Sequence, residues 1–216
     1  MVCGVSGSRA RALDPLSCLS ATELDRFESL NARARVDFLA GRVALKEALR
    51  RSLGCTDLDP LRICVENDES GRPTLIHHPH LHCSLAHSHG WGVGAVARRP
   101  LGVDVERIRP RSGSLLGHIA DAAEIDLVAG GTARDPELLV TLWTLKEAVL
   151  KGIGTGLQVA PRDVRICAYD NRIFTLEVRS GNNHGRWSVQ NMKIEDMMIS
   201  VALKGHYEEP LRISWY

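Results

Sequence analysis

The chain has 216 residues, of which 44% are hydrophobic and 25% are charged, and its formal net charge at pH 7 is +1. These values are typical of a soluble globular protein with one large domain or two small ones. The near-neutral charge excludes a strong overall attraction to nucleic acid or membrane. No segment approaches the roughly 20 apolar residues of a membrane-spanning helix.

The cysteines and the amino terminus point to one compartment. Six cysteines are scattered along the chain without a Cys-x-x-Cys pair, a distribution that predicts free thiols rather than a disulfide framework. The first residues contain no apolar run long enough for a signal peptide. We therefore expect a cytoplasmic protein.

In chain order, the first predicted element is a short helix that begins at the capping box Ser20 to Glu23. Apolar residues from about Arg35 to Leu53 recur at helical spacing, and Gly54 ends this second helix. Short β-branched and apolar runs between turn residues then predict strands at 62–67, 72–76 and 82–88. We expect residues 91–97 and 101–108 to form a hairpin that folds at residues 98–100.

The second half begins with a long predicted helix. Asp135 and Pro136 fit its N-cap and first position, and the glycine-rich segment 152–156 ends it. Further strands are predicted at 163–169, 172–178, 187–194 and 197–203, and the tail has no clear pattern.

Short stretches of the first half recur in the second half in the same order. They are 44–54 with 144–154, 61–64 with 164–167, and 91–98 with 198–205. Common helix and strand patterns also recur by chance, but the ordered series favours two copies of one helix-plus-antiparallel-sheet unit. The predicted fold is therefore α+β, with an N-terminal half at 1–100 and a C-terminal half at 101–216.

Four charged residues have a spacing that permits chemistry. Asp104 and Glu106 alternate along a strand and so share one face, which is the usual polar face of a half-buried strand and also a place for Mg²⁺. Glu147 and Lys151 form an i,i+4 pair worth about 0.2–0.5 kcal/mol on any exposed helix. Because Glu47 has an arginine at the same spacing, the pattern alone does not mark Glu147 as catalytic.

The densest cluster of histidines lies between residues 77 and 89, beside Cys83. Zinc sites usually take ligands from two separated pairs, whereas this sequence has one cluster. A zinc site here stays open as the weaker alternative.

Four motifs in order resemble the signature of the Sfp-type 4′-phosphopantetheinyl transferases: Gly71–Pro73, Ser84–Gly90, Gly102–Ile108 and Trp143–Leu157. The resemblance runs from about residue 20 to the last strand. It implies a pseudo-dimer of two similar halves with the active site between them. The N-terminal half is then expected to contact the nucleotide of coenzyme A, and the C-terminal half to hold magnesium and the catalytic helix.

The resemblance implies transfer of the 4′-phosphopantetheine group of coenzyme A to a serine hydroxyl of an apo acyl or peptidyl carrier protein, with Mg²⁺ and release of adenosine 3′,5′-bisphosphate. The implied metal ligands are Asp104, Glu106 and Glu147. The implied catalytic residues are Glu147 as the base, Lys151 and Asp104. The implied coenzyme A contacts are Arg26, Gly71, Arg72, Pro73, Ser84, Leu85, Ala86, His87, Asp104, Lys146 and Lys151.

One position in this implied site has two candidates, and another departs from the family pattern. Arg33 rivals Arg26 as the phosphate contact, and Ala86 stands where the family often has a serine. The implied setting is polyketide or non-ribosomal peptide biosynthesis, with a monomeric enzyme that modifies its carrier after translation. An inactive module that binds coenzyme A or a carrier protein is the main alternative.

Overall fold

The computed structural model describes residues 3–9, 13–110, 115–129, 136–154, 159–170, 172–179, 184–206 and 213–215. The chain divides into two compact units, residues 1–100 with 211–216, and residues 101–210. The last residues, expected in the second half, belong to the first unit because strand β11 (Ile213–Trp215) pairs in parallel with strand β1 (Cys3–Arg9). No helix in the described residues is long and apolar enough to cross a membrane.

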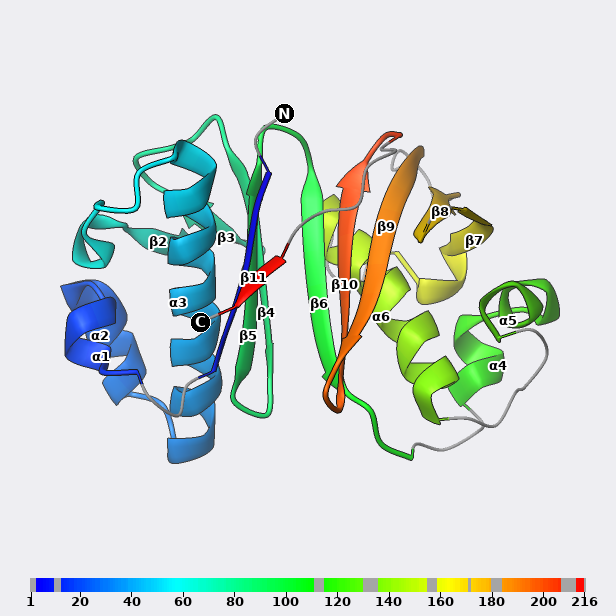
Figure 1. Cartoon of the computed structure of the whole chain (residues 1–216), viewed down its shortest axis with the longest axis horizontal. Helices are drawn as coiled ribbons and strands as arrows, with labels where there is room; N and C mark the ends of the chain where they lie inside the picture. Colours follow the sequence, from blue (N-terminus) through cyan, green and yellow to red (C-terminus); the bar gives the residue numbers. More distant parts are fainter. Residues whose placement is uncertain are drawn as a thin grey trace. The chain divides into compact units, whose positions relative to one another are not determined.

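The first unit is a sheet with one long helix on its face (Figure 1). Its strands lie in the order β11-β1-β5-β4, and β2 pairs with β3 in a separate ribbon. Helix α3 packs on the sheet through Leu45 and Leu49, which join Val96 and Cys83 in the core. The elements after β1 are α1 (Pro15–Cys18), α2 (Ala21–Glu28), α3 (Ala32–Leu53), a 3-10 turn (Pro60–Arg62), β2 (Val65–Asn67), β3 (Pro73–Leu75), β4 (His82–Ser88) and β5 (Trp91–Ala97).

The second unit has the same elements in the same order (Figure 1). They are β6 (Leu101–Arg107), α4 (Leu116–Ile119), α5 (Ala122–Ala129), α6 (Pro136–Ile153), a 3-10 turn (Pro161–Asp163), β7 (Val164–Asp170), β8 (Ile173–Val178), β9 (Gly185–Ile194) and β10 (Met197–Lys204). The sheet has the order β6-β10-β9-β8-β7, and every pair is antiparallel.

The predicted internal repeat and α+β class are confirmed. The strand order β1-β5-β4 of the first unit matches β6-β10-β9 of the second. Both units also bury an ion pair between the second short helix and the long helix, with Nζ–Oε distances of 2.5 Å for Lys46–Glu23 and 2.7 Å for Lys146–Glu124. Two such pairs at equivalent positions show that one packing arrangement is used twice.

The helix boundaries largely follow the predicted signals. The capping box at Ser20 is present, and α3 ends at Leu53 with Gly54 in the left-handed region at φ 66°. Helix α3 begins earlier than predicted because Asn31 caps it, accepting a hydrogen bond from the backbone of Ala34 at 3.0 Å. The proposed N-cap Asp135 and the end of the glycine-rich stop, residues 155 and 156, lie outside the described residues.

The predicted hairpin of 91–97 with 101–108 is wrong. Both edges of β5 are already occupied, by β1 and by β4, so no edge is left for β6. Strand β6 pairs with β10 instead, with Leu101 opposite Leu203. Residues 98–100 therefore connect the two units rather than form a hairpin turn.

Candidate functional site

Strand β6 and helix α6 bring four charged residues together in the second unit. Asp104 and Glu106 lie on β6, and Glu147 and Lys151 lie on α6. The helix approaches the strand very closely at Gly102, where an added Cβ would stand 2.0 Å from the Ala148 carbonyl oxygen. This contact places the polar face of β6 against the helix, so that Lys151 Nζ donates to Asp104 Oδ1 at 2.6 Å.

Among the three carboxylates of this cluster, Asp104 is the most buried. It is 4% exposed, and its Oδ2 atom has no hydrogen-bond partner in the described part of the chain. Leaving a buried carboxylate oxygen without a partner costs free energy. Asp104 therefore presents an oxygen that is ready to accept a cation or a donor.

Glu147 is half-buried within reach of the other charges. Burial raises the pKa of the Glu147 carboxyl, and the negative charges of Asp104 and Glu106 raise it further, while Lys151 lowers it. With all four groups ionised, three carboxylates and one ammonium leave two negative charges in excess. Hard carboxylate oxygens with this excess fit Mg²⁺, which would relieve the repulsion.

The histidine stretch does not form a metal site. In the described ranges, no group of three or more His, Cys, Asp or Glu side chains is placed to hold a metal ion. The whole segment 77–89 is described, so the structure gives the zinc alternative no support, and the same finding covers Asp104, Glu106 and Glu147 as they are arranged without a cation. His89 and Gly90 instead form the turn between β4 and β5, both with positive φ. In the carboxylate group, the cation on Asp104 is the ammonium of Lys151.

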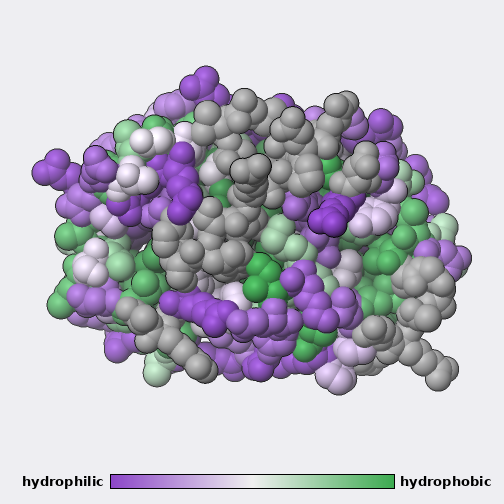
Figure 2. Space-filling view, in the orientation of Figure 1, coloured by the Kyte–Doolittle hydropathy of each residue, from purple (hydrophilic) through white to green (hydrophobic). Residues whose placement is uncertain are grey.

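The first unit has a pocket of about 980 Å³ bounded by α2, α3, the β2–β3 ribbon and β4. That volume is in the range of small-molecule and cofactor sites. The pocket brings together six of the residues expected to bind coenzyme A or to compete for that role: Arg26, Arg33, Gly71, Pro73, Leu85 and His87. Figure 2 shows hydrophilic and hydrophobic residues mixed over the coloured surface of the molecule.

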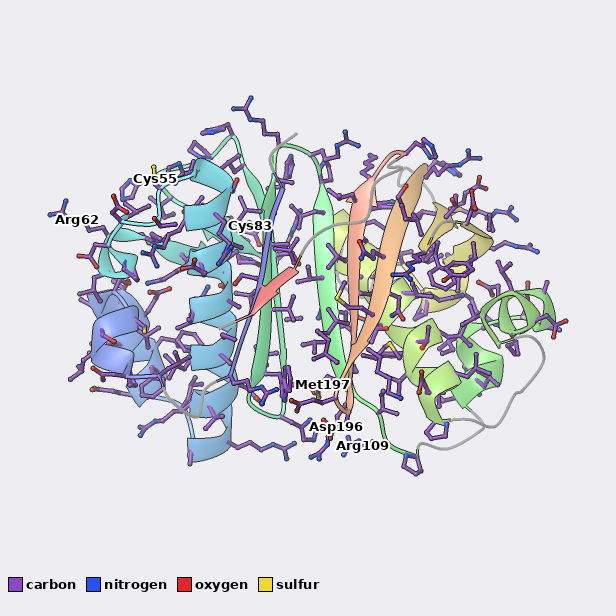
Figure 3. All side chains as sticks on the ribbon, viewed as in Figure 1. Cys55, Arg62, Cys83, Arg109, Asp196 and Met197 are labelled. Carbon is purple, nitrogen blue, oxygen red and sulfur yellow. The ribbon has the colours of Figure 1, made fainter. Side chains whose placement is uncertain are left out.

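The turn that carries Gly71 is held from both sides. Asp68 Oδ1 accepts hydrogen bonds from the Ser70 and Arg72 backbones, each at 2.9 Å, and Gly71 takes φ 84°, a conformation that suits glycine. The Cys83 thiol donates to the Pro73 carbonyl at 3.1 Å, and burial raises the pKa of this thiol to about 12. Figure 3 shows Cys83 on β4 beside α3.

Arg42 is the pocket residue that sequence reasoning missed. It is 8% exposed, and its Nη2 donates to Asn67 Oδ1 at 3.1 Å. Its Nε and Nη1 have no hydrogen-bond partner among the described residues, although Nε lies 3.6 Å from Glu23 Oε1. Burial lowers the pKa of this guanidinium. A comparison of the two copies could have found Arg42. The long helix of the second unit has Leu142 at the equivalent position, so the repeated packing does not require a charge there.

Four expected contact residues are not brought to these groups. Lys146 is 1% exposed, and its Nζ donates to the Ile119 carbonyl at 2.5 Å besides pairing with Glu124. Ser84 and Ala86 are buried and lie on the face of β4 opposite Leu85 and His87. Arg72 is half-buried and is not among the residues that line the pocket.

Comparisons with known proteins agree on one family. A family model described as the 4′-phosphopantetheinyl transferase superfamily matches residues 100–202. The 4′-phosphopantetheinyl transferase psf-1 of Bacillus pumilus is 34% identical over 61% of this chain and 58% of its own length. The 4′-phosphopantetheinyl transferase Sfp of Bacillus subtilis is 28% identical over 56% of this chain and 53% of its length. A holo-[acyl-carrier-protein] synthase of Anoxybacillus flavithermus is 34% identical over 36% of this chain and 70% of its length.

The chain belongs to the 4′-phosphopantetheinyl transferase superfamily, and within it resembles the Sfp-type members from Bacillus. The match spans between half and three-fifths of the length of these two Bacillus proteins. The family-model match contains Asp104, Glu106, Glu147 and Lys151.

Proposed function

We propose that the protein transfers the 4′-phosphopantetheine group of coenzyme A to a serine hydroxyl of an apo acyl or peptidyl carrier protein. One observation carries this proposal. The four residues that the family resemblance assigns to metal and phosphate lie in one partly buried group with an excess of negative charge, although they come from two separate elements. If Asp104 and Glu106 were only the polar face of a strand, there would be no reason for the helix residues of the last motif to lie beside them.

The carboxylate group is assigned to the transfer step. Asp104, Glu106 and Glu147 would hold Mg²⁺, which neutralises charge on the diphosphate of coenzyme A when it is bound. Glu147 accepts the proton of the carrier serine, whose oxygen forms a bond to the phosphorus next to pantetheine. The bond from that phosphorus to the bridging oxygen breaks, and adenosine 3′,5′-bisphosphate leaves with the electron pair. Lys151 donates to the phosphate oxygens.

The first-unit pocket is assigned to the nucleotide of coenzyme A. Arg26 or Arg33 at its rim, His87 on β4 and the turn at Gly71 supply the contacts that the resemblance implies. Arg42 joins them, because its unpartnered N–H groups suit a phosphate. Lys146, Ser84, Ala86 and Arg72 are left out of the proposed contacts.

The proposed setting follows from the carrier chemistry. The carrier would belong to a fatty-acid, polyketide or non-ribosomal peptide pathway. The cysteines with described side chains are free, which supports a cytoplasmic location where thiols stay reduced. We propose a monomer, because one chain already contains two copies of the unit, and light scattering in solution tests this.

The test is incubation with coenzyme A, Mg²⁺ and a panel of apo carrier proteins, followed by mass spectrometry of each carrier. We expect at least one carrier to gain one phosphopantetheine group, and Glu147→Gln to abolish the gain. The matched control is Glu47→Gln, the equivalent glutamate of the first unit, which should retain activity. Normal modification by a folded Glu147→Gln variant contradicts the mechanism. Coenzyme A binding without a mass gain on any carrier favours a binding module.

A further inference from the structure

Asp104 and Lys151 form an ion pair at the same place where the proposed function puts a metal. The Lys151 ammonium lies 2.6 Å from Asp104 Oδ1, and the two side chains are 36% and 6% exposed. A buried carboxylate needs a counter-charge, because removal of its partner leaves an uncompensated charge inside the protein. In this structure Lys151 supplies that counter-charge.

A divalent cation on Asp104 would stand next to the ammonium. Two positive charges on one small carboxylate repel each other strongly in a partly dry environment. Asp104 Oδ2 is buried without a partner among the described residues, so Asp104 has one oxygen to offer while the other is occupied. Lys151 lies at the more exposed side of the pair and has a flexible stem, which lets it leave Asp104 while its helix stays in place.

We propose that Lys151 is the counter-ion that Asp104 uses before the metal arrives, so that Lys151 and Mg²⁺ compete for the same carboxylate. Binding of Mg²⁺ to Asp104 releases the ammonium, and the released ammonium is then available to the phosphates of coenzyme A. Lys151 thus opposes metal binding in the free protein and favours phosphate binding once the metal is present. The inference rests on the proposed function, because it takes its metal site from there.

The test measures Mg²⁺ binding to the free protein, without coenzyme A, by isothermal titration and by the Mg²⁺-induced shift in Tm. We expect Lys151→Gln to bind Mg²⁺ about tenfold more tightly than the unmodified protein, in the range of coupling between linked sites. Lys151→Gln should also have a lower Tm without Mg²⁺ and recover it when Mg²⁺ is added, because Asp104 has lost its counter-ion. Lys151→Arg keeps the charge and should bind Mg²⁺ as weakly as the unmodified protein.

Two controls separate direct competition from a general change in charge. Arg107→Gln removes one positive charge from the same strand, where Arg107 pairs with Asp196, labelled in Figure 3; it should leave Mg²⁺ affinity within about twofold, because an exposed charge is screened. The double variant Asp104→Asn with Lys151→Gln should lose the Mg²⁺ response.

The outcomes separate a failure of this inference from a failure of the proposed function on which it rests. If Lys151→Gln binds Mg²⁺ no more tightly than the unmodified protein, or if Arg107→Gln has the same effect, competition at Asp104 is overturned while the metal site stands. If neither the unmodified protein nor Lys151→Gln responds to Mg²⁺, with or without coenzyme A, the metal assignment itself is overturned. A gain in affinity confined to Lys151→Gln and dependent on Asp104 supports the proposal.

Discussion

Glu47 and Glu147 occupy the same position in the two copies of the unit and differ in their surroundings. Glu47 pairs with Arg50 at 2.7 Å and with Arg51 at 3.4 Å along its own helix. The strand beside it has Ser6 and Ser8 where β6 has Asp104 and Glu106, as the equivalent glycines 4 and 102 show. Glu147 therefore lies beside carboxylates, whereas Glu47, among the described residues, pairs with arginines of its own helix.

The raised pKa of Glu147 predicts a pH-dependent stability. A carboxyl with a folded-state pKa above its ordinary value of 4.5 binds protons more tightly in the folded state, so stability is lost as the pH rises from that value through the folded-state pKa. Glu147→Gln removes this penalty. We expect the variant to have a higher Tm than the unmodified protein at neutral pH without Mg²⁺, and the gain to vanish at pH 4, in thermal melts. A gain of equal size at both pH values would contradict the prediction.

Arg42 predicts a selective effect on nucleotide binding. We expect Arg42→Leu, which introduces the residue of the second unit, to weaken binding of adenosine 3′,5′-bisphosphate by about 10- to 100-fold, the value of hydrogen bonds to a charged group, measured by isothermal titration. Binding of adenosine should change little. The control Arg62→Leu alters an arginine that points to solvent (Figure 3) and should bind as before. Equal loss for both ligands would indicate a structural role instead.

At the scale of elements, the close contact between α6 and β6 positions the carboxylate group. Gly102 has no space for a side chain, since an added Cβ would also lie 2.4 Å from the Gly152 nitrogen. We expect Gly102→Ala to lower the free energy of unfolding by about 1–3 kcal/mol, as overpacking does, in urea denaturation. Gly117→Ala is the matched control: nothing lies within 4 Å of its added Cβ, so its stability should stay the same or rise slightly. Equal losses in the two variants would exclude this contact as the cause.

Strand periodicity decides which residues of one motif reach the pocket. Leu85 and His87 line it, whereas Ser84 and Ala86 are buried on the opposite face. The segment therefore borders the pocket, and the alternation of side chains along β4 decides which of its residues face that pocket. The same alternation placed Asp104 and Glu106 together from sequence alone.

At the scale of the molecule, the chain returns to its first unit at the end. Strand β11 pairs with β1, with Val5 opposite Ile213 and Gly7 opposite Trp215. We expect deletion of residues 211–216 to expose the outer edge of β1 and to reduce hydrogen-exchange protection there, while β9 and β10 of the second unit keep theirs. Exchange measured by mass spectrometry tests this, and an equal loss of protection in β10 would contradict it.

Elements with a strong repeating pattern were predictable, and weakly patterned ones were not. Helices α3 and α6 carry long apolar patterns, α3 has a cap at each end, and β5 is an apolar run buried along its whole length. Strand β1 is rich in glycine and serine, and α4 has only four residues, so neither gives a periodic signal. The false hairpin of β5 with β6 arose because pairing was inferred from nearness along the chain. In the structure that edge of β5 pairs with β1, whose residues Cys3 to Arg9 lie opposite Ala97 to Trp91.

The sequence by itself determined the two-copy α+β architecture and the family, and it singled out the four charged residues of the second unit as candidates. Local periodicity and ordered motifs indicate these features, and neither depends on contacts between residues far apart in the chain. Only the tertiary structure decided that Lys146 is a buried partner of Glu124, that Arg42 lines the pocket and that Lys151 forms an ion pair with Asp104. The reason is physical: burial and pairing depend on which residues a fold brings together from far along the chain, and residue type and spacing do not record this.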